Sequence, residues 1–269
     1  MSVLLMTVWL TGCVQEEFES TPSPAGNGIR FTLTVPDVNL PSVSSRTMTG
    51  TGTAKKEDEI ETVDILVFDM SKTPAVFLEW VSATGVTQDL ADNSTVSFSA
   101  VLSPTTASTC IVVVANKELD NIVSGFTKGA TTKVEAMEKM LHTQTGKWLA
   151  DGSTTGGYTR IPMYGEKVIS KITPSMDPIT GINMKRMLAR IDIRNNSATS
   201  NFTVEEVYLA NYNTTGYIAP AWNTNGQVTD PVPDTPVLPA GSGKMTEEGD
   251  AILYSVNGNT PYDGEIYTF

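Results

Sequence analysis

Few side chains in this sequence have the types and spacing that enzymatic chemistry needs. His142 is the only histidine, which leaves little scope for a serine or cysteine triad and none for a zinc site built from several histidines. Residues 241–244 (GSGK) superficially resemble a phosphate-binding loop, but the upstream glycine is missing and Met245 stands where a serine or threonine would hold magnesium. We therefore expect no catalytic residue, no metal site and no cofactor, and a protein that is not an enzyme.

Cys13 is the first residue whose surroundings suggest covalent chemistry. The preceding apolar run, Val3–Leu10, is far shorter than the roughly 20 residues that span a bilayer, and is typical of a secretory signal. Leu10-Thr11-Gly12-Cys13 resembles the lipobox of bacterial lipoproteins, in which the thiol takes a diacylglycerol. We expect residues 1–12 to be a lipoprotein signal peptide, although no lysine or arginine precedes the apolar run. Acyl chains on Cys13 would then anchor the protein to a membrane.

The residues after Cys13 are predicted to form a flexible leash. Residues 14–18 (VQEEF) resemble the acidic signal that routes lipoproteins of Bacteroides-like bacteria to the cell surface, and a solvated acidic tether is the alternative. The prolines and glycines that follow, up to residue 28, favour an extended, flexible chain. We expect an outer membrane lipoprotein exposed at the cell surface.

Arg46 is the second candidate for covalent processing. Residues 37–58 lack hydrophobic periodicity and are rich in serine, threonine and glycine, which predicts an exposed loop. Exposed loops with small polar residues are where proteases cut. The bond between Arg46 and Thr47 is therefore a candidate cleavage site, with an ordinary surface arginine as the alternative.

A strand is predicted between these two processing sites. Ile29, Phe31, Leu33 and Val35 alternate with polar residues, which gives a period of two with one apolar face, and Pro36 ends the run. Because the strand lies between an anchor and a cut site, its place in the fold could be temporary.

Composition excludes one class of partner and favours one class of fold. The sequence has 18 Lys and Arg residues against 30 Asp and Glu residues, for a formal charge of -12, so its mean field repels the phosphates of nucleic acids. Abundant threonine, serine, asparagine, glycine and proline favour many short strands joined by turns. We expect a mainly β protein that does not bind nucleic acid.

Alternating or continuous apolar runs predict strands over 60–69, 76–81, 96–102, 110–115, 168–172, 187–193, 202–209, 251–256 and 265–269. Thr132 and Glu135 have the spacing of a capping box and predict one short helix with Val134, Met137 and Leu141 on one face. Cys110 opens a buried run and is expected to be an inert thiol, unless an unlipidated Cys13 forms a disulfide with it. His142 is expected to be structural.

The chain is long enough for two domains. Residues 173–183 are predicted to be a linker, which divides the chain into residues 47–180 and residues 181–269. The last strand pattern has no closing turn, so we expect the second domain to be incomplete. Residues 216–250 are predicted to be a long loop that is functional or mobile.

Several segments together resemble the fimbrillin family of Bacteroidales, the subunits of pili assembled from outer membrane lipoproteins. They are the lipobox at Cys13, the strand followed by a loop with Arg46, Glu59-Ile60 leading into residues 63–68 (VDILVF), residues 112–116 (VVVAN), residues 161–166 (IPMYGE) and residues 186–193 (RMLARIDI). The resemblance implies two tandem transthyretin-like Greek-key β-sandwich domains, with the short helix in the first.

The resemblance also implies a route of assembly. An extracellular arginine-specific protease would cut between Arg46 and Thr47, and residues 13–46 would leave with the first strand. Arg30 lies inside a strand pattern and fits the cut site poorly. A strand from another fimbrial subunit, of the same or a different kind, would then fill the groove. In this family the C-terminal segment commonly donates that strand, so this chain is either truncated or a variant that accepts a strand without donating one.

Two functions follow as hypotheses. The first is a structural subunit of a cell-surface fimbrium that polymerises by protease-triggered strand exchange and supports adhesion. The alternative is a non-polymerising surface lipoprotein that binds host protein or glycan, with residues 216–250 as its binding loop.

Overall fold

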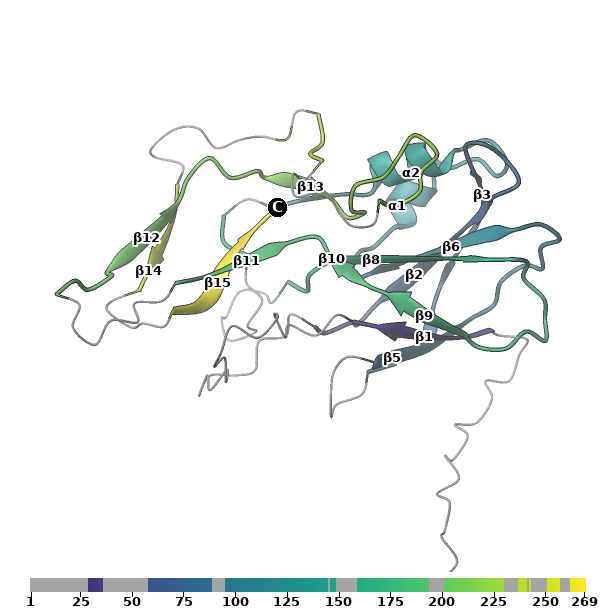
Figure 1. Ribbon diagram of the computed structural model, residues 1–269, viewed down its shortest axis with the longest axis horizontal. Helices are drawn as coiled ribbons and strands as arrows, with labels where there is room; N and C mark the ends of the chain where they lie inside the picture. Colours follow the sequence, from purple (N-terminus) through teal and green to yellow (C-terminus); the bar gives the residue numbers. More distant parts are fainter. Residues whose placement is uncertain are drawn as a thin grey trace, which may run out of the picture.

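The structure is a computed structural model, and it describes residues 29–35, 58–88, 95–144, 146–148, 159–193, 201–229, 237–240, 242, 251–256 and 262–269. Its strands are β1 (Ile29–Thr34), β2 (Val63–Asp69), β3 (Val76–Ser82), β4 (Thr84–Gln88), β5 (Thr95–Ala100), β6 (Thr109–Ala115), β7 (Leu141–Thr143), β8 (Met163–Ile169), β9 (Ile179–Asn183), β10 (Lys185–Arg186), β11 (Ala189–Ile193), β12 (Glu206–Leu209), β13 (Thr215–Tyr217), β14 (Ile252–Ser255) and β15 (Tyr262–Thr268). The helices are α1 (Asp120–Val123) and α2 (Lys133–Lys139). The prediction of a mainly β protein is confirmed (Figure 1).

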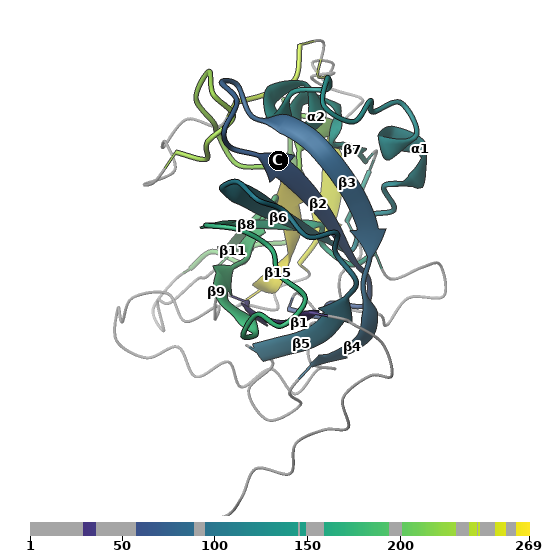
Figure 2. The same ribbon diagram turned by 90° about the vertical axis from the view of Figure 1, so that its right-hand side faces the viewer.

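Two sheets packed face to face form a β-sandwich (Figure 2). The four-stranded sheet has the order β4-β5-β1-β9, and the five-stranded sheet has the order β10-β8-β6-β2-β3. The core between them is built from alternate residues of β1 and β5 on one side and of β2 and β6 on the other. Burial of one face of each strand is what a period of two predicts for such a sandwich.

The five-stranded sheet is covered on its second face by both helices. Leu66 and Phe68 of β2 pack there against Ala136 and Met137 of α2, in a cluster separate from the core of the sandwich. Every residue of β6 is therefore buried, as the continuous apolar run predicts. Residues 218–219, which were predicted to lie in a long loop, are buried in the same cluster.

Helix α2 begins at the predicted capping box. The Thr132 hydroxyl accepts a hydrogen bond from the Glu135 amide, and the Glu135 carboxylate accepts one from the Thr132 amide. The prediction that Leu141 lies on the apolar face of this helix was wrong, because the helix ends at Lys139 and Leu141 begins β7. A second short helix, α1, was not predicted.

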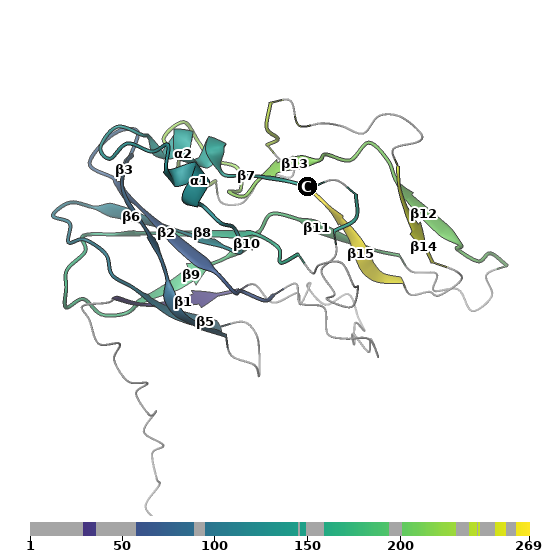
Figure 3. The ribbon, with the colours of Figure 1, turned by 180° about the vertical axis from the view of Figure 1, so that it is seen from behind.

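The C-terminal strands pair as short ribbons beside the sandwich (Figures 1 and 3). β11 pairs with β15, β12 pairs with β14, and β13 pairs with β7. The first two ribbons share a small apolar core that includes Ile252, Tyr254 and Ile266. No helix in the described part of the chain is long and apolar enough to cross a bilayer.

Two segments differ from the sequence-based expectation. The strand predicted over 168–172 is β8, which begins at Met163 and ends at Ile169. Its first three residues are all buried, so they show no alternation that would mark a strand. The predicted linker contains β9, and the predicted domain boundary at residue 180 falls inside this strand.

Candidate functional site

The predicted first strand, β1, lies inside the four-stranded sheet and not at its edge (Figure 2). It pairs antiparallel with β5, from Ile29 opposite Ala100 to Thr34 opposite Thr95. On its other side it pairs parallel with β9, where Phe31 lies opposite Ile179. Both edges of β1 are therefore used, and removing the strand would leave a groove whose walls are β5 and β9.

The apolar face of β1 fills the core of the sandwich. Ile29, Phe31, Leu33 and Val35 are at most 4% exposed and belong to the main core cluster. The ring of Phe31 stacks on that of Phe98, with ring centroids 5.0 Å apart and planes inclined by 6°. The four residues predicted to form a removable strand therefore share one buried face.

The connectivity of β1 sets it apart from the other strands of its sheet. Its neighbours β5 and β9 lie far along the chain, and the next strand in sequence, β2, belongs to the five-stranded sheet. No hairpin joins β1 to either neighbour. The chain between β1 and β2 is thus the only covalent link from β1 forward to the sandwich.

The β9 wall is positioned by a close approach to β8. A Cβ atom on Gly165 would lie 2.7 Å from the Met184 sulfur and 2.8 Å from Cγ2 of Ile182, so any larger residue would require these buried side chains to shift. The Lys167 ammonium also donates a hydrogen bond to the Thr180 carbonyl oxygen. Gly165 belongs to the IPMYGE segment, whose structural role is to admit β9 beside β8.

The predicted processing residues, Cys13, Arg46 and Thr47, lie outside the described residues. The other cysteine, Cys110, is a buried free thiol. Burial raises the pKa of Cys110 to about 11, so the reactive thiolate is scarce at neutral pH.

A buried ionic cluster lies beside Cys110 and has no signature in the sequence. The Nζ atom of Lys133, in α2, is 2.6 Å from Oε2 of Glu166, in β8, and the Lys133 side chain is 1% exposed. The Tyr164 hydroxyl donates to the same carboxylate oxygen at 2.5 Å, and the Val228 amide donates to the other at 3.4 Å. Desolvation raises the pKa of Tyr164 well above its usual range, so this hydroxyl keeps its proton. The cluster joins α2, β8 and residues 218–228.

Among the described residues, no group of three or more His, Cys, Asp or Glu side chains could hold a metal ion.

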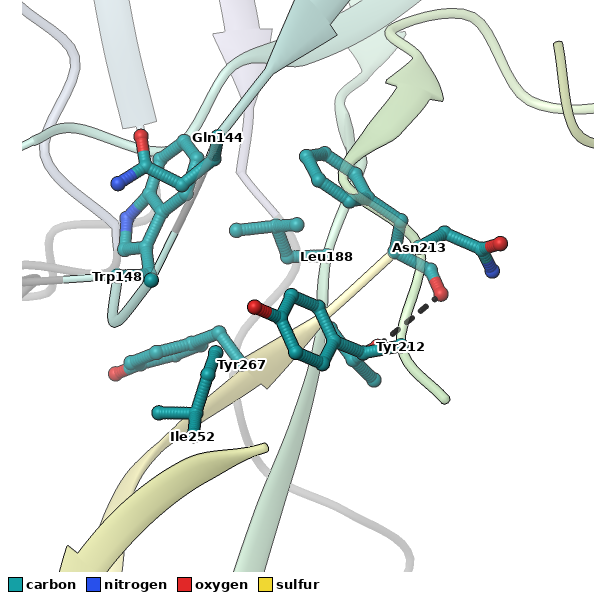
Figure 4. A pocket seen from close by; sticks show the side chains of 10 residues that line it. Gln144, Trp148, Leu188, Tyr212, Asn213, Ile252 and Tyr267 are labelled. Atoms are coloured by element: carbon teal, nitrogen blue, oxygen red, sulfur yellow. Dashed lines mark hydrogen bonds between the residues drawn. The ribbon is translucent and has the colours of Figure 1, made fainter. Parts of the chain in front are cut away.

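His142 lies where β7 pairs with β13, next to a small aromatic pocket. The ring centroid of His142 is 4.9 Å from that of Trp148 and 6.4 Å from that of Phe269. The pocket, lined by Trp148, Tyr212 and Tyr267 among others, has a volume of about 10 Å³ (Figure 4). That volume is about enough for one water molecule.

The stability of the folded protein is expected to fall in acid because of His142. Desolvation, followed by the charge of Lys117, lowers the pKa of His142 to about 4 from 6.5. The unfolded chain therefore binds a proton at His142 between these pH values while the folded chain does not, and stability falls as the pH drops from about 6.5 towards 4. Thermal unfolding across this range should show a shallower pH dependence for His142→Leu than for the wild type. Equal slopes would show that His142 titrates normally in the fold.

Solved structures with a similar course of the chain come from Parabacteroides and Bacteroides species. A candidate cell adhesion protein from Parabacteroides distasonis is 16% identical with a TM-score of 0.49, and the alignment covers 91% of this chain and 70% of the other. A fimbrial assembly protein from the same species is 11% identical with a TM-score of 0.41, covering 88% of each chain. Candidate polysaccharide-binding proteins from Bacteroides thetaiotaomicron are 11% identical with a TM-score of 0.40, covering 89% of this chain and 71% of the other.

The sequence matches none of the curated proteins. The family model of the major fimbrial subunit protein (FimA) matches residues 29–233, which begin at β1 and run through both sheets of the sandwich. This match covers about three quarters of the 269 residues and confirms the family that the sequence segments suggested. The chain therefore belongs to the FimA family of major fimbrial subunit proteins.

Proposed function

We propose that this fimbrial subunit polymerises by strand exchange, in which proteolysis frees β1 and a strand of a neighbouring subunit replaces it. The observation that carries the proposal is that β1 is an inner strand without a hairpin to either sheet neighbour. A cut between β1 and β2 would sever its only forward link to the sandwich. An incoming strand could then reform hydrogen bonds with both β5 and β9.

The energetics of β1 explain why exchange needs a trigger. Burying the four apolar side chains of residues 29–35 contributes about 6–12 kcal/mol gross, at about 1.5–3 kcal/mol each. Such a strand does not leave on its own. After cleavage, an incoming strand with the same alternation replaces both the buried side chains and the main-chain hydrogen bonds, so the net change in free energy is small.

The placement of the described arginines supports Arg46 as the cut site. Arg30 and Arg190 lie inside paired strands, and Arg186 pairs with β8. Arg160 forms ion pairs with Glu59 and Glu61. Strand pairing occupies the backbone hydrogen-bonding groups of the first three, and the ion pairs restrain the fourth, so none of them lies in the kind of exposed loop where proteases cut. Of the two remaining arginines, Arg46 and Arg194, only Arg46 lies between β1 and β2.

The export route is the less direct part of the proposal. The lipobox sequence supports lipidation at Cys13, and residues 14–18 support delivery to the outer surface of the outer membrane. In this scheme the lipid anchor tethers the precursor to the membrane, and the same cut that frees β1 also releases the subunit from the anchor. Adhesion is then a property of the assembled fimbrium.

Arg46→Ala should abolish polymerisation. Purified precursor is treated with an arginine-specific protease, and both mass and oligomer size are followed. The wild type is expected to lose the segment before Thr47 and then form a ladder of multimers. Arg194→Ala is the matched control and should behave like the wild type. A ladder from Arg46→Ala would place the cut elsewhere. A cut protein that stays monomeric, also when it is mixed with fimbrial subunits that carry a donor strand, would favour the alternative of a non-polymerising binding protein.

A further inference from the structure

The segment Asp58–Glu61, which leads into β2, is held by two side-chain amides. The Gln88 amide donates to the Asp58 carbonyl at 2.8 Å and accepts from the Ile60 amide at 3.1 Å. The Asn116 amide donates to the Glu59 carbonyl at 2.7 Å and accepts from the Glu61 amide at 3.0 Å. Four consecutive residues thus have a backbone group bonded to Gln88 or Asn116. We call Asp58–Glu61 the clamp segment.

The two amides come from different sheets. Gln88 is the last residue of β4, in the four-stranded sheet, and Asn116 directly follows β6, in the five-stranded sheet. Asn116 has a left-handed backbone with φ of 58°, and its side chain donates a further bond to the Ile161 carbonyl at 3.0 Å. The clamp segment therefore ties both sheets together at the end of the sandwich where β2 begins.

Ion pairs add a third set of contacts that hold the clamp segment. Arg160 lies 2.7 Å from a carboxylate oxygen of Glu61 and 3.3 Å from one of Glu59. Arg186, in β10, forms an ion pair with Asp58 and has a side chain that is 16% exposed. The pair of Arg186 and Asp58 is the more shielded from water, whereas the Glu61 side chain is 61% exposed, so the Arg186 contact restrains the segment more than the Arg160–Glu61 contact does.

These ties reach both walls of the groove that β1 occupies. Gln88 ends β4, which is hydrogen-bonded to β5, and Arg186 follows β9 by three residues. Among the described strands, β5 and β9 are joined to each other in the sheet only through β1. Without β1, their separation of two strand spacings, about 10 Å, must be kept by contacts outside the sheet.

We propose that the clamp segment keeps the groove open at the width of one strand while β1 is exchanged, with Gln88 and Asp58 as positioning residues for the β5 and β9 walls. This proposal rests on the proposed function. It also sets the downstream limit of the removable segment, because residues from Asp58 onward stay bonded to the sandwich. The Glu59-Ile60, VVVAN and IPMYGE segments of the sequence meet at this clamp.

The test uses a fluorescent peptide with the sequence of residues 29–35 (IRFTLTV) as the incoming strand. Wild type, Asp58→Ala and Gln88→Ala precursors are cut with an arginine-specific protease, which is inhibited before the peptide is added because the peptide contains an arginine, and peptide uptake is then measured by fluorescence anisotropy. Asp58→Ala loses the ion pair with Arg186, and Gln88→Ala loses the two hydrogen bonds of its side-chain amide. We expect about ten-fold weaker peptide binding for each variant, the scale of losing a charge-assisted or buried hydrogen-bonding contact. The uncut variants should keep the circular dichroism spectrum of the wild type, because β1 still joins the walls.

Glu79→Ala is the matched control, because it also removes side-chain hydrogen bonds by truncation. Glu79 accepts hydrogen bonds from the amide and hydroxyl of Ser103, beyond the end of β5 that is remote from the clamp segment. This variant should bind the peptide like the wild type. If both clamp variants also bind like the wild type, or if Glu79→Ala binds as weakly as they do, the clamp proposal is overturned while strand exchange stands. If the cut wild type takes up no peptide, strand exchange and the clamp proposal both fail.

Discussion

Glu166→Ala is expected to destabilise the protein by about 3–5 kcal/mol, because it leaves the ammonium of Lys133 buried without its partner carboxylate. The Lys133 side chain is 1% exposed and the Glu166 side chain 20% exposed, so the ammonium itself lies away from water. The Tyr164 hydroxyl and the Val228 amide lose an acceptor at the same time. Chemical denaturation, monitored by tryptophan fluorescence, measures the change.

A double variant separates the buried charge from the lost packing. In Lys133→Met with Glu166→Gln the charge pair is gone, a side chain of similar length lies under α2, and the amide oxygen introduced at position 166 still accepts from Tyr164. Replacing a buried pair by uncharged groups of similar volume is often nearly neutral, so the double variant should be much more stable than Glu166→Ala. A cost below about 1 kcal/mol for Glu166→Ala would show that water reaches Lys133.

The sequence predicts well those elements whose burial follows from local pattern. The alternation from Ile29 to Val35, the apolar run of β6 and the capping box of α2 each appear at the predicted place. In these segments the residues themselves determine which face is buried. Family membership could also be recognised, because the matching segments are strands and turns in a fixed order.

The structural features that the local sequence pattern did not predict depend on contacts with residues far away in the sequence. β9 contains Gly181, with φ of 71°, and follows Pro178, so its sequence is typical of a linker. It is a strand because β1 pairs with it across about 150 residues of sequence and Gly165 admits it beside β8. Likewise, nothing local marks Lys133 as buried. Its partner Glu166 is 33 residues away.

Phe31→Ala is expected to destabilise the uncut precursor by about 3–5 kcal/mol, the usual cost of deleting a buried aromatic ring. The ring is 1% exposed and stacks on Phe98, so its loss leaves a cavity at the centre of the sandwich. If β1 is exchanged, the effect must vanish from the assembled polymer, because the cut removes residue 31 with its segment. Melting of precursor and polymer, each compared with the wild type, measures both effects.

Phe98→Ala provides the matched comparison, because Phe98 lies opposite Phe31 on β5 and remains after the cut. It should destabilise the precursor by a similar amount, about 3–5 kcal/mol, and should also destabilise the polymer, since the incoming strand packs on the same ring position. The pair of variants therefore distinguishes a replaced strand from a retained one. A polymer of Phe31→Ala that melts as early as one of Phe98→Ala would mean that β1 stays in its groove, and that subunits associate through another surface.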